Sequence, residues 1–145
     1  MKYRNKNQCC ERKSNKSINP LINRRQPDPL QYVFYAILNT DLHMNQGIAA
    51  ANIATGLMFL YDKLKTNNVK CQYIDYWKRN GQRIIILKGY DHKHLKYLQE
   101  EIKFLALGTY VVRHKWSRNS TIKVLVVFGQ KEHLQEVFEG LSYLR

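Results

Sequence analysis

The sequence contains few cysteines: three in 145 residues, at Cys9, Cys10 and Cys71. An odd number of cysteines, two of them adjacent, does not form the disulfide framework that is typical of small secreted domains. The adjacent pair also lacks the spacing of zinc ligands or of a redox motif. We therefore expect an intracellular protein.

Long apolar segments are missing as well. The most apolar stretch, residues 47–61, is interrupted by Asn52, Thr55 and Gly56 and is shorter than the ~20 residues that span a bilayer. The basic N-terminus is not followed by the apolar core of a secretory signal. We expect no membrane association and a cytoplasmic location, with a mitochondrial location as the alternative.

Acidic residues are scarce, with 11 Asp and Glu against 24 Lys and Arg and a formal net charge of +13. This excess favours polyanionic partners, and nucleic acid is the first of them. Apolar residues still make up 44% of the chain, which is enough to fill a core. The length is that of one domain, so we do not expect a two-domain enzyme with a cleft between the domains.

Residues 1–30 differ in composition from the rest of the chain. They carry eight basic and two acidic side chains, a net charge of +6, together with all three prolines and few apolar residues. Segments of this kind stay disordered on their own. We predict a basic disordered tail over residues 1–30 and a folded domain over residues 31–145. The tail is either a solubilising or address segment, or an arm that follows a phosphate backbone.

Four segments have the pattern of β-strands. Residues 32–38 and 83–88 are nearly continuous apolar runs, as in strands covered on both faces, and we interpret residues 83–88 as a central strand. Residues 109–116 alternate between two faces, and residues 122–128 form a fourth apolar run after a short turn.

Three segments have helical periodicity: residues 46–64, 91–106 and 131–140. We expect Asp91 to cap the second helix and Gly108 to end it. Residues 65–82 form a loop or a short helix. The apolar stripe of the first helix, expected to face the sheet, consists of Ala50, Ile53, Leu57, Leu60 and Leu64. The opposite side of that helix carries the small or polar residues Ala49, Asn52, Thr55 and Gly56.

The resulting order of elements is β-α-β-α-β-β-α. Helical crossovers join parallel strands, whereas the short turn before the last strand joins antiparallel ones. The sequence therefore predicts an α/β fold with a single mixed four-stranded sheet and helices on both faces.

In sheets of this type, ligands bind beyond the carboxyl ends of the strands, where loops meet helix N-termini. Here that region comprises residues 39–47, together with residues 114–119 if the third strand runs parallel to the first. Asp41 lies beside helix-start amides, a setting suited to a phosphate or a developing oxyanion. Turn formation and helix capping explain the polar residues of this loop equally well.

Residues 40–52, TDLHMNQGIAAAN, resemble the second (archaeal and eukaryotic) class of peptidyl-tRNA hydrolases. In that family a Thr-Asp-Leu turn, a Met, a glycine-containing loop and an Ala-Ala helix follow the first strand. Further matching positions are Trp77, Gly81, Gln82, Asp91, Leu95, Gly129 and the closing LSYLR. The resemblance covers about residues 31–145 and is closest to the divergent branch described as peptidyl-tRNA hydrolase domain-containing.

The resemblance implies a small α/β domain that hydrolyses the ester between a peptide and tRNA, and the chain departs from the family at key positions. Ile48 stands where the family has its catalytic Lys, and Thr55 where it has a helix His. The family's Asp-Ala-Gly after the third strand falls on residues 114–116, and its following Thr-containing, Pro-Gly loop is shortened to residues 117–121.

As a substitute catalytic set we predict three residues: Asp41, His114 and Lys115. In it His114 acts as the base, because its unperturbed pKa lies near neutrality, and Lys115 or the helix-start amides stabilise the anion. The alternative is that His114 is merely packed or hydrogen-bonded in its strand.

Basic and aromatic side chains lie near the predicted site. The candidate RNA-binding residues are Trp77, Lys78, Arg79, Arg83, Arg113 and Arg118. Such a mixture binds phosphates and stacks on single-stranded ends, so we expect tRNA or another RNA as partner. The alternative is that Trp77 belongs to the core and the cations form a solvated edge.

We expect no metal and no cofactor. His92 and His94 face different directions in the first turn of a helix, no Cys or carboxylate completes a zinc set, and no glycine-rich phosphate loop is present. The sequence thus predicts a peptidyl-tRNA hydrolase-like protein that binds tRNA and hydrolyses the peptidyl-tRNA ester. The alternative is a catalytically inactive RNA- or protein-binding module on the same fold. A protein partner stays open, and the sequence does not determine the oligomeric state.

Overall fold

The computed structural model describes residues 31–114 and 120–144. The strands are β1 (Tyr32–Asn39), β2 (Ile84–Gly89), β3 (Gly108–Arg113) and β4 (Ile122–Gln130). The helices are the short 3-10 helix η2 (Thr40–Leu42), α2 (Gln46–Lys65), α3 (Cys71–Arg79), α4 (His92–Ile102) and α5 (Lys131–Gln135). The predicted tail 1–30 and the candidate residues Lys115 and Arg118 lie outside the described residues.

The four strands form one mixed sheet in the order β2-β1-β4-β3. β1 pairs in parallel with β2, and β4 runs antiparallel to both β1 and β3. β3 therefore has the same direction as β1 and β2. The predicted single mixed four-stranded sheet is confirmed.

The prediction that residues 83–88 form a central strand is wrong, because β2 is the edge strand next to β1. Part of its outer side pairs with the C-terminal segment: Lys88 N–H donates to the Ser142 carbonyl at 2.9 Å, and Leu144 N–H donates to the Ile86 carbonyl at 3.0 Å. An apolar run shows that a strand is covered on its faces, but its hydropathy does not say whether another strand lies on each side.

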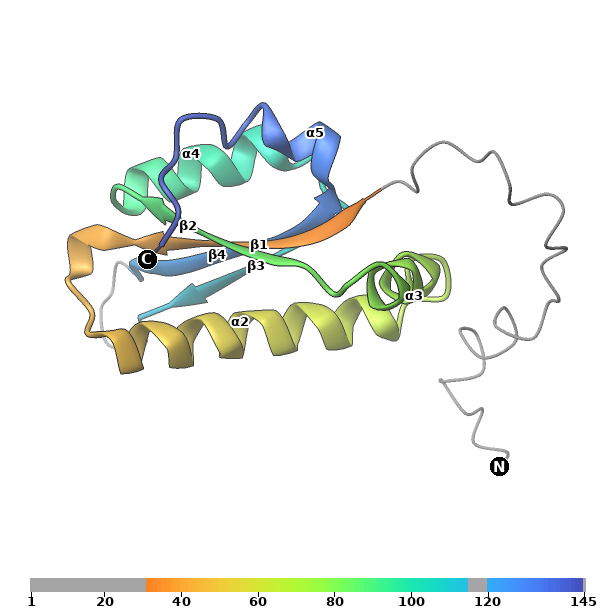
Figure 1. Ribbon diagram of the computed structural model, residues 1–145. Coiled ribbons are helices and arrows are strands. Elements are labelled where there is room, and N and C mark those ends of the chain that lie inside the picture. The colour runs from red at the N-terminus through yellow and green to blue at the C-terminus, as the bar shows by residue number, and fades with distance from the viewer. Residues whose placement is uncertain (1–30, 115–119, 145) are drawn as a thin grey trace, which may run out of the picture.

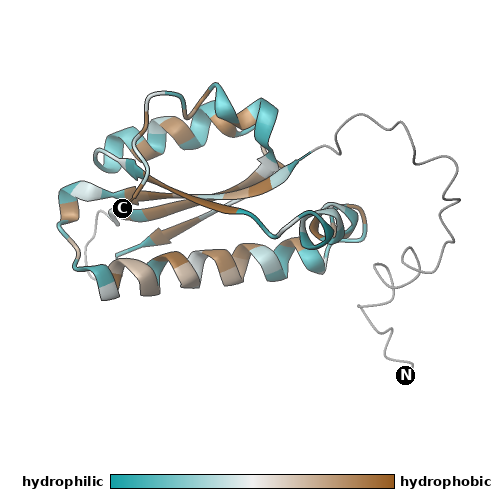
Figure 2. Cartoon of the chain, viewed as in Figure 1, coloured by the Kyte–Doolittle hydropathy of each residue, from teal (hydrophilic) through white to brown (hydrophobic). Residues whose placement is uncertain are grey.

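Helices cover both faces of the sheet, as predicted (Figure 1). On one face α2 and α3 pack over a core that includes Phe34 and Phe128. On the other face α4 and α5 cover a core that includes Leu95 and Phe138. Figure 2 shows hydrophobic residues along the strands between these two helical layers.

α2 is the longest helix, and its contact with the sheet differs from the prediction. Ala49 and Gly56 are buried, whereas Ala50, assigned to the sheet-facing stripe, is exposed. A Cβ on Gly56 would lie 2.6 Å from Val126 Cγ2, so only glycine permits this approach of helix and sheet. No helix in the described part of the chain is long and apolar enough to cross a membrane.

α4 begins as predicted and ends earlier. The side chain of Asp91 accepts a hydrogen bond of 2.8 Å from His94 N–H and caps the helix. The helix ends at Ile102, and Leu105 is 42% exposed instead of continuing the buried stripe. Gly108 does not end the helix; it is the first residue of β3.

The other two helices also differ in length from the prediction. Within residues 65–82 the structure has the helix α3, which is the second of the two forms considered. α5 ends at Gln135 instead of residue 140. Leu134 and Phe138 are nevertheless buried, as the periodicity predicted.

Candidate functional site

The carboxyl ends of β1, β2 and β3 meet at one edge of the sheet, because these strands run in the same direction. The N-termini of α2 and α4 lie at the same edge, on the left in Figure 1. We call this edge the rim: residues 39–48, 88–94, 113–114 and 120–122. The expectation that the segments after the first and third strands share an edge of the sheet is therefore met.

Asn39 fixes the end of β1. It is 1% exposed, its side-chain nitrogen donates to the Ile122 carbonyl at 2.8 Å, and its side-chain oxygen accepts a hydrogen bond of 3.0 Å from Asp41 N–H. One buried amide thus joins β1 to the start of β4 and begins the turn that carries Asp41. The Asp41 side chain itself is exposed.

Thr40 joins the end of β1 to the end of β2. Its hydroxyl donates to the Gly89 carbonyl at 2.6 Å. His43 follows η2 in the left-handed region at φ 49°, and its N–H donates to the Thr40 carbonyl at 3.3 Å. This tight turn brings the chain from β1 to the start of α2.

The N-terminus of α2 is capped by Asn45, whose side chain accepts a hydrogen bond of 2.8 Å from Ile48 N–H. The Ile48 side chain is 50% exposed at this first turn. The amides of Gln46 and Gly47 belong to the group of helix-start N–H donors that have no partner within the helix. They form the positive end of the helix dipole at the rim.

His114 follows β3 at the rim and is partly buried. Its N–H donates to the Thr121 carbonyl at 3.0 Å, which continues the pairing of the two chain segments beyond β3. Arg113 donates from Nη1 to the carbonyl and the hydroxyl of Ser120, at 3.1 and 3.3 Å. Asp41 and His114 are thus placed at the same edge, whereas Lys115 lies outside the described residues.

Two further histidines at the rim accept hydrogen bonds from backbone N–H groups. His92 Nδ1 accepts a hydrogen bond of 3.0 Å from Ile122 N–H, and His94 Nδ1 accepts one of 3.0 Å from Tyr90 N–H. Both rings are therefore structural acceptors, a role that the sequence analysis missed. Within the described residues no group of three or more His, Cys, Asp or Glu side chains is arranged to hold a metal ion.

A small hollow of about 310 Å³ opens at the rim between β1, β2 and the C-terminal segment. It is lined by Thr40, Lys88, Gly89, Tyr90 and Ser142. Lys88 and Tyr90 were not among the predicted site residues. Their position at the carboxyl end of an apolar strand, Lys88 next to its last residue and Tyr90 directly after it, is the signal that would have identified them.

Most predicted RNA-binding residues lie away from the rim, contrary to the prediction that they are near it. Trp77, Lys78 and Arg79 are on α3 and Arg83 directly precedes β2, so all four are at the amino ends of β1 and β2, on the opposite edge of the sheet. Arg113 does lie at the rim, and Arg118 is outside the described residues.

Contacts on α3 show how these four residues are held. Trp77 Nε1 donates to the Arg83 carbonyl at 2.9 Å, and its ring meets Phe34 edge-on at a centroid distance of 4.8 Å. Arg79 pairs with Asp75 at 2.9 Å, and the Lys78 ammonium lies 5.2 Å from the centre of the Tyr61 ring. Trp77 is therefore largely a packing residue, which was the alternative considered for it.

The comparison with protein-family models agrees with the fold. The family model described as peptidyl-tRNA hydrolase PTH2 matches residues 32–144, which include every described strand and helix. A search of curated proteins finds no match. The expected place in a divergent branch of the family stays a prediction. Because the family model matches far more than half of the sequence, the chain belongs to the peptidyl-tRNA hydrolase PTH2 family.

Proposed function

We propose that the protein binds the acceptor end of peptidyl-tRNA at the rim and hydrolyses the peptidyl ester there, with His114 as general base. The observation that carries the proposal is the common direction of β1 and β3, which places His114 at the same edge as Asp41 and the start of α2. Membership of the family supports the substrate class.

The reaction requires a base for water and donors for the carbonyl oxygen. His114 takes a proton from the water that attacks the ester carbonyl carbon, and it returns the proton to the ribose oxygen as the carbon–oxygen bond breaks. A positioned base of this kind contributes about 10²- to 10⁴-fold to the rate. Asp41 supplies a carboxylate that stabilises the imidazolium charge formed on His114.

The helix-start amides of α2 are the candidate donors for the oxyanion. Asn45 already occupies Ile48 N–H, so the amides of Gln46 and Gly47 remain for this role. Each such donor is worth about 10²- to 10³-fold in rate. Lys115, which the sequence places next to His114, is a further candidate cation for the anion.

Binding of tRNA rests on charge. The chain has a formal net charge of +13, and Lys88 and Arg113 are exposed at the rim. Phosphates attract such groups. Binding releases counterions from the nucleic acid, so the affinity falls as the salt concentration rises. We therefore place the terminal nucleotides of the acceptor end beside Lys88 and Arg113.

The test is release of peptide from peptidyl-tRNA by the full chain. We expect His114→Ala to lower kcat/KM by about 100-fold or more, as for loss of a general base, with tRNA affinity kept. His133→Ala is the matched control, because His133 is exposed on α5, away from the rim. Equal activities of the two variants would remove His114 from the mechanism.

The second candidate function is a binding module without hydrolysis. Ile48 favours it, because an exposed alkyl group at the first turn of α2 can neither activate water nor stabilise an anion. Retained tRNA binding with no release above the buffer rate would select this function. An affinity for tRNA that does not change with salt would instead exclude nucleic acid and leave a protein partner.

A further inference from the structure

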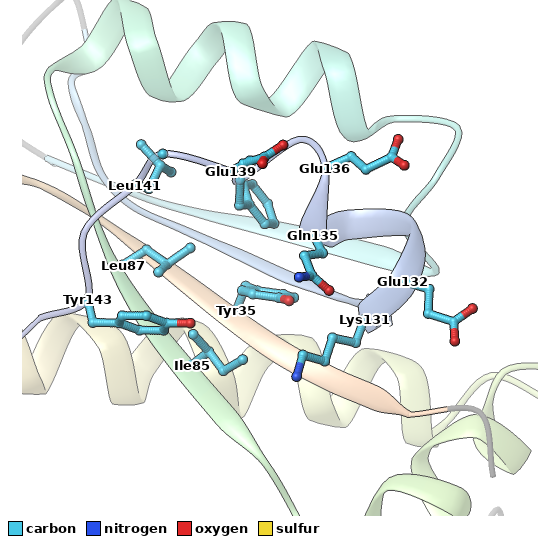
Figure 3. Close-up of a pocket in the computed structure, with 12 residues that line it drawn as sticks. Tyr35, Ile85, Leu87, Lys131, Glu132, Gln135, Glu136, Glu139, Leu141 and Tyr143 are labelled. Atoms are coloured by element: carbon cyan, nitrogen blue, oxygen red, sulfur yellow. The ribbon is translucent and has the colours of Figure 1, made fainter. Parts of the chain in front are cut away.

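A larger cavity lies on the other side of the sheet from α2, apart from the rim. It has a volume of about 660 Å³ and lies between β1, β2, α5 and the C-terminal segment (Figure 3). Volumes of this size are typical of sites for small organic ligands. Its lining consists of Tyr35, Ile85, Leu87, Lys131, Glu132, Gln135, Glu136, Phe138, Glu139, Gly140, Leu141 and Tyr143.

Tyr35 is the central polar group of this cavity. Its side chain is 4% exposed and its ring packs on Phe138 at a centroid distance of 4.9 Å. Within the described residues its hydroxyl makes no hydrogen bond to another group of the chain, although it is turned to the cavity. A hydroxyl that has no partner in the protein and is open to a cavity is a donor that a ligand can use.

Burial keeps this hydroxyl protonated. Burial raises the pKa of Tyr35 above its ordinary value of 10.0, Tyr143 raises it further, and the positive charge of Arg83 lowers it in part. At neutral pH Tyr35 is therefore a neutral hydrogen-bond donor and not a second anion in the cavity.

Other donors line the same end of the cavity. Figure 3 shows the Gln135 amide beside the Tyr35 hydroxyl, the Lys131 side chain at the same end of the ring with its ammonium turned away from that hydroxyl, and Tyr143 on the opposite side. The backbone N–H of Lys131 donates to the Gln31 carbonyl at 2.8 Å, which fixes the start of α5 beside β1. An ammonium, an amide and a hydroxyl on rigid elements form a suitable pocket for one anionic group.

The remaining charges restrict the ligand. Figure 3 shows the carboxylates of Glu132 and Glu136 directed away from Tyr35. Together with Glu139 they still line the cavity, where Lys131 is the one cation among the lining residues. A phosphate chain or RNA carries several negative charges and would meet more repulsion from these three carboxylates than a ligand with one carboxylate, which can pair with Lys131. The walls of Ile85, Leu87 and Leu141 suit an apolar body.

We propose that this cavity binds a small organic molecule that carries one carboxylate on an apolar body. The carboxylate accepts hydrogen bonds from Tyr35, Lys131 and Gln135, and the apolar body lies against Ile85 and Leu87. The site is independent of the rim, so its occupation does not require the proposed hydrolysis.

The experiment is an NMR titration of the full chain with octanoate and with 4-phenylbutanoate. We expect saturable shifts of the Tyr35, Lys131 and Gln135 backbone signals below about 10 mM ligand, and affinities at least about tenfold weaker for the corresponding neutral amides. No shift of these signals by either acid, or equal binding of acid and amide, would overturn the proposal.

Two variants test the assigned contacts. Lys131→Met and Tyr35→Phe keep most of the shape of the side chain, and each is expected to weaken carboxylate binding by about tenfold. The control Lys63→Met removes one positive charge from an exposed position on α2. Loss of binding in the control equal to that in Lys131→Met would mean that net charge alone attracts the acid, and would also overturn the proposal.

Discussion

The ring of His92, at the start of α4, accepts a hydrogen bond of 3.0 Å from the backbone N–H of Ile122, the first residue of β4. The carbonyl of the same residue accepts a hydrogen bond of 2.8 Å from the side chain of Asn39. Side chains from two other elements therefore form hydrogen bonds with both the N–H and the carbonyl of Ile122. These contacts hold the end of β1, the start of β4 and the start of α4 together at the rim.

We predict that His92→Ala destabilises the protein. The substitution leaves the partly buried Ile122 N–H without an acceptor, which costs about 1–3 kcal/mol. Lys93→Ala, at an exposed position on the next residue, is expected to change stability by less than about 0.5 kcal/mol. Urea unfolding followed by circular dichroism measures both values. Equal stabilities of the two variants would show that the contact contributes nothing.

We predict that Gly56→Ala also destabilises the protein, although alanine favours helices. A Cβ at this position would lie 2.6 Å from Val126 Cγ2 and 3.0 Å from Val112 Cγ2, so the buried sheet has to shift. Overpacking of this kind costs about 1–3 kcal/mol, which exceeds the gain of about 1 kcal/mol in helix propensity.

Gly47→Ala is the control for this substitution. Its Cβ would meet only Asn45 Oδ1, at 3.6 Å, so the helix propensity of alanine is realised without a clash. We expect Gly47→Ala to be neutral or stabilising when both glycine variants are compared by urea unfolding followed by circular dichroism. A stabilised Gly56→Ala protein would contradict the close contact between α2 and the sheet.

The sequence predicted the sheet and its helices because each element carries its own pattern. The continuous apolar run of β1 and the cap at Asp91 depend on neighbouring residues alone. The sheet-facing side of α2 was harder to predict from the sequence, since hydropathy does not distinguish Ala49 from Ala50. What decides between them is the close approach at Gly56, which depends on side chains of two strands.

The rim was predicted in part. The direction of the strands follows from the helical crossovers, so the shared edge of Asp41 and His114 could be derived. The same rule, applied to Trp77 and Arg83, would have placed them at the opposite edge, because residues that precede a parallel strand lie at its amino end. The contacts of Asn39 and His92 with Ile122 join distant positions of the chain, and no local pattern encodes them.

We predict that Tyr35 contributes to loss of stability at high pH. Burial raises the pKa of its hydroxyl in the folded protein, while the unfolded chain ionises near the ordinary value of 10.0. Above that value the unfolded state binds fewer protons than the folded state, so stability falls as pH rises. Below it, the contribution is fully present.

Tyr35→Phe tests this pH dependence. Phenylalanine has no ionisable group, so the decrease in the free energy of unfolding between about pH 9 and pH 11 should be smaller than in the unchanged protein. Urea unfolding across this range gives the comparison, with Tyr97→Phe as the control at an exposed position. Equal slopes for the two variants would exclude a raised pKa for Tyr35.

The last prediction concerns the two separated groups of cations. β1 has eight residues, and a strand rises about 3.3 Å per residue. The rim and the opposite edge of the sheet, where α3 lies, are therefore about 26 Å apart. With the single-stranded end seated at the rim, we expect the duplex stem that follows it to extend along the sheet. Lys78, Arg79 and Arg83 would then contact the stem.

The triple variant Lys78→Gln, Arg79→Gln, Arg83→Gln should therefore bind full tRNA more weakly, with a salt dependence reduced by up to about 0.9 per lost phosphate contact, and bind a short 3′-end oligonucleotide unchanged. Arg113→Gln should weaken both. A control with two charges removed, Lys96→Gln on α4 and Lys103→Gln directly after it, separates contact from net charge, since both residues are exposed and lie outside the rim. Equal losses per removed charge in the two variants would mean that total charge alone governs affinity. Loss of oligonucleotide binding in the α3 variant would place the single-stranded end at α3 instead of the rim.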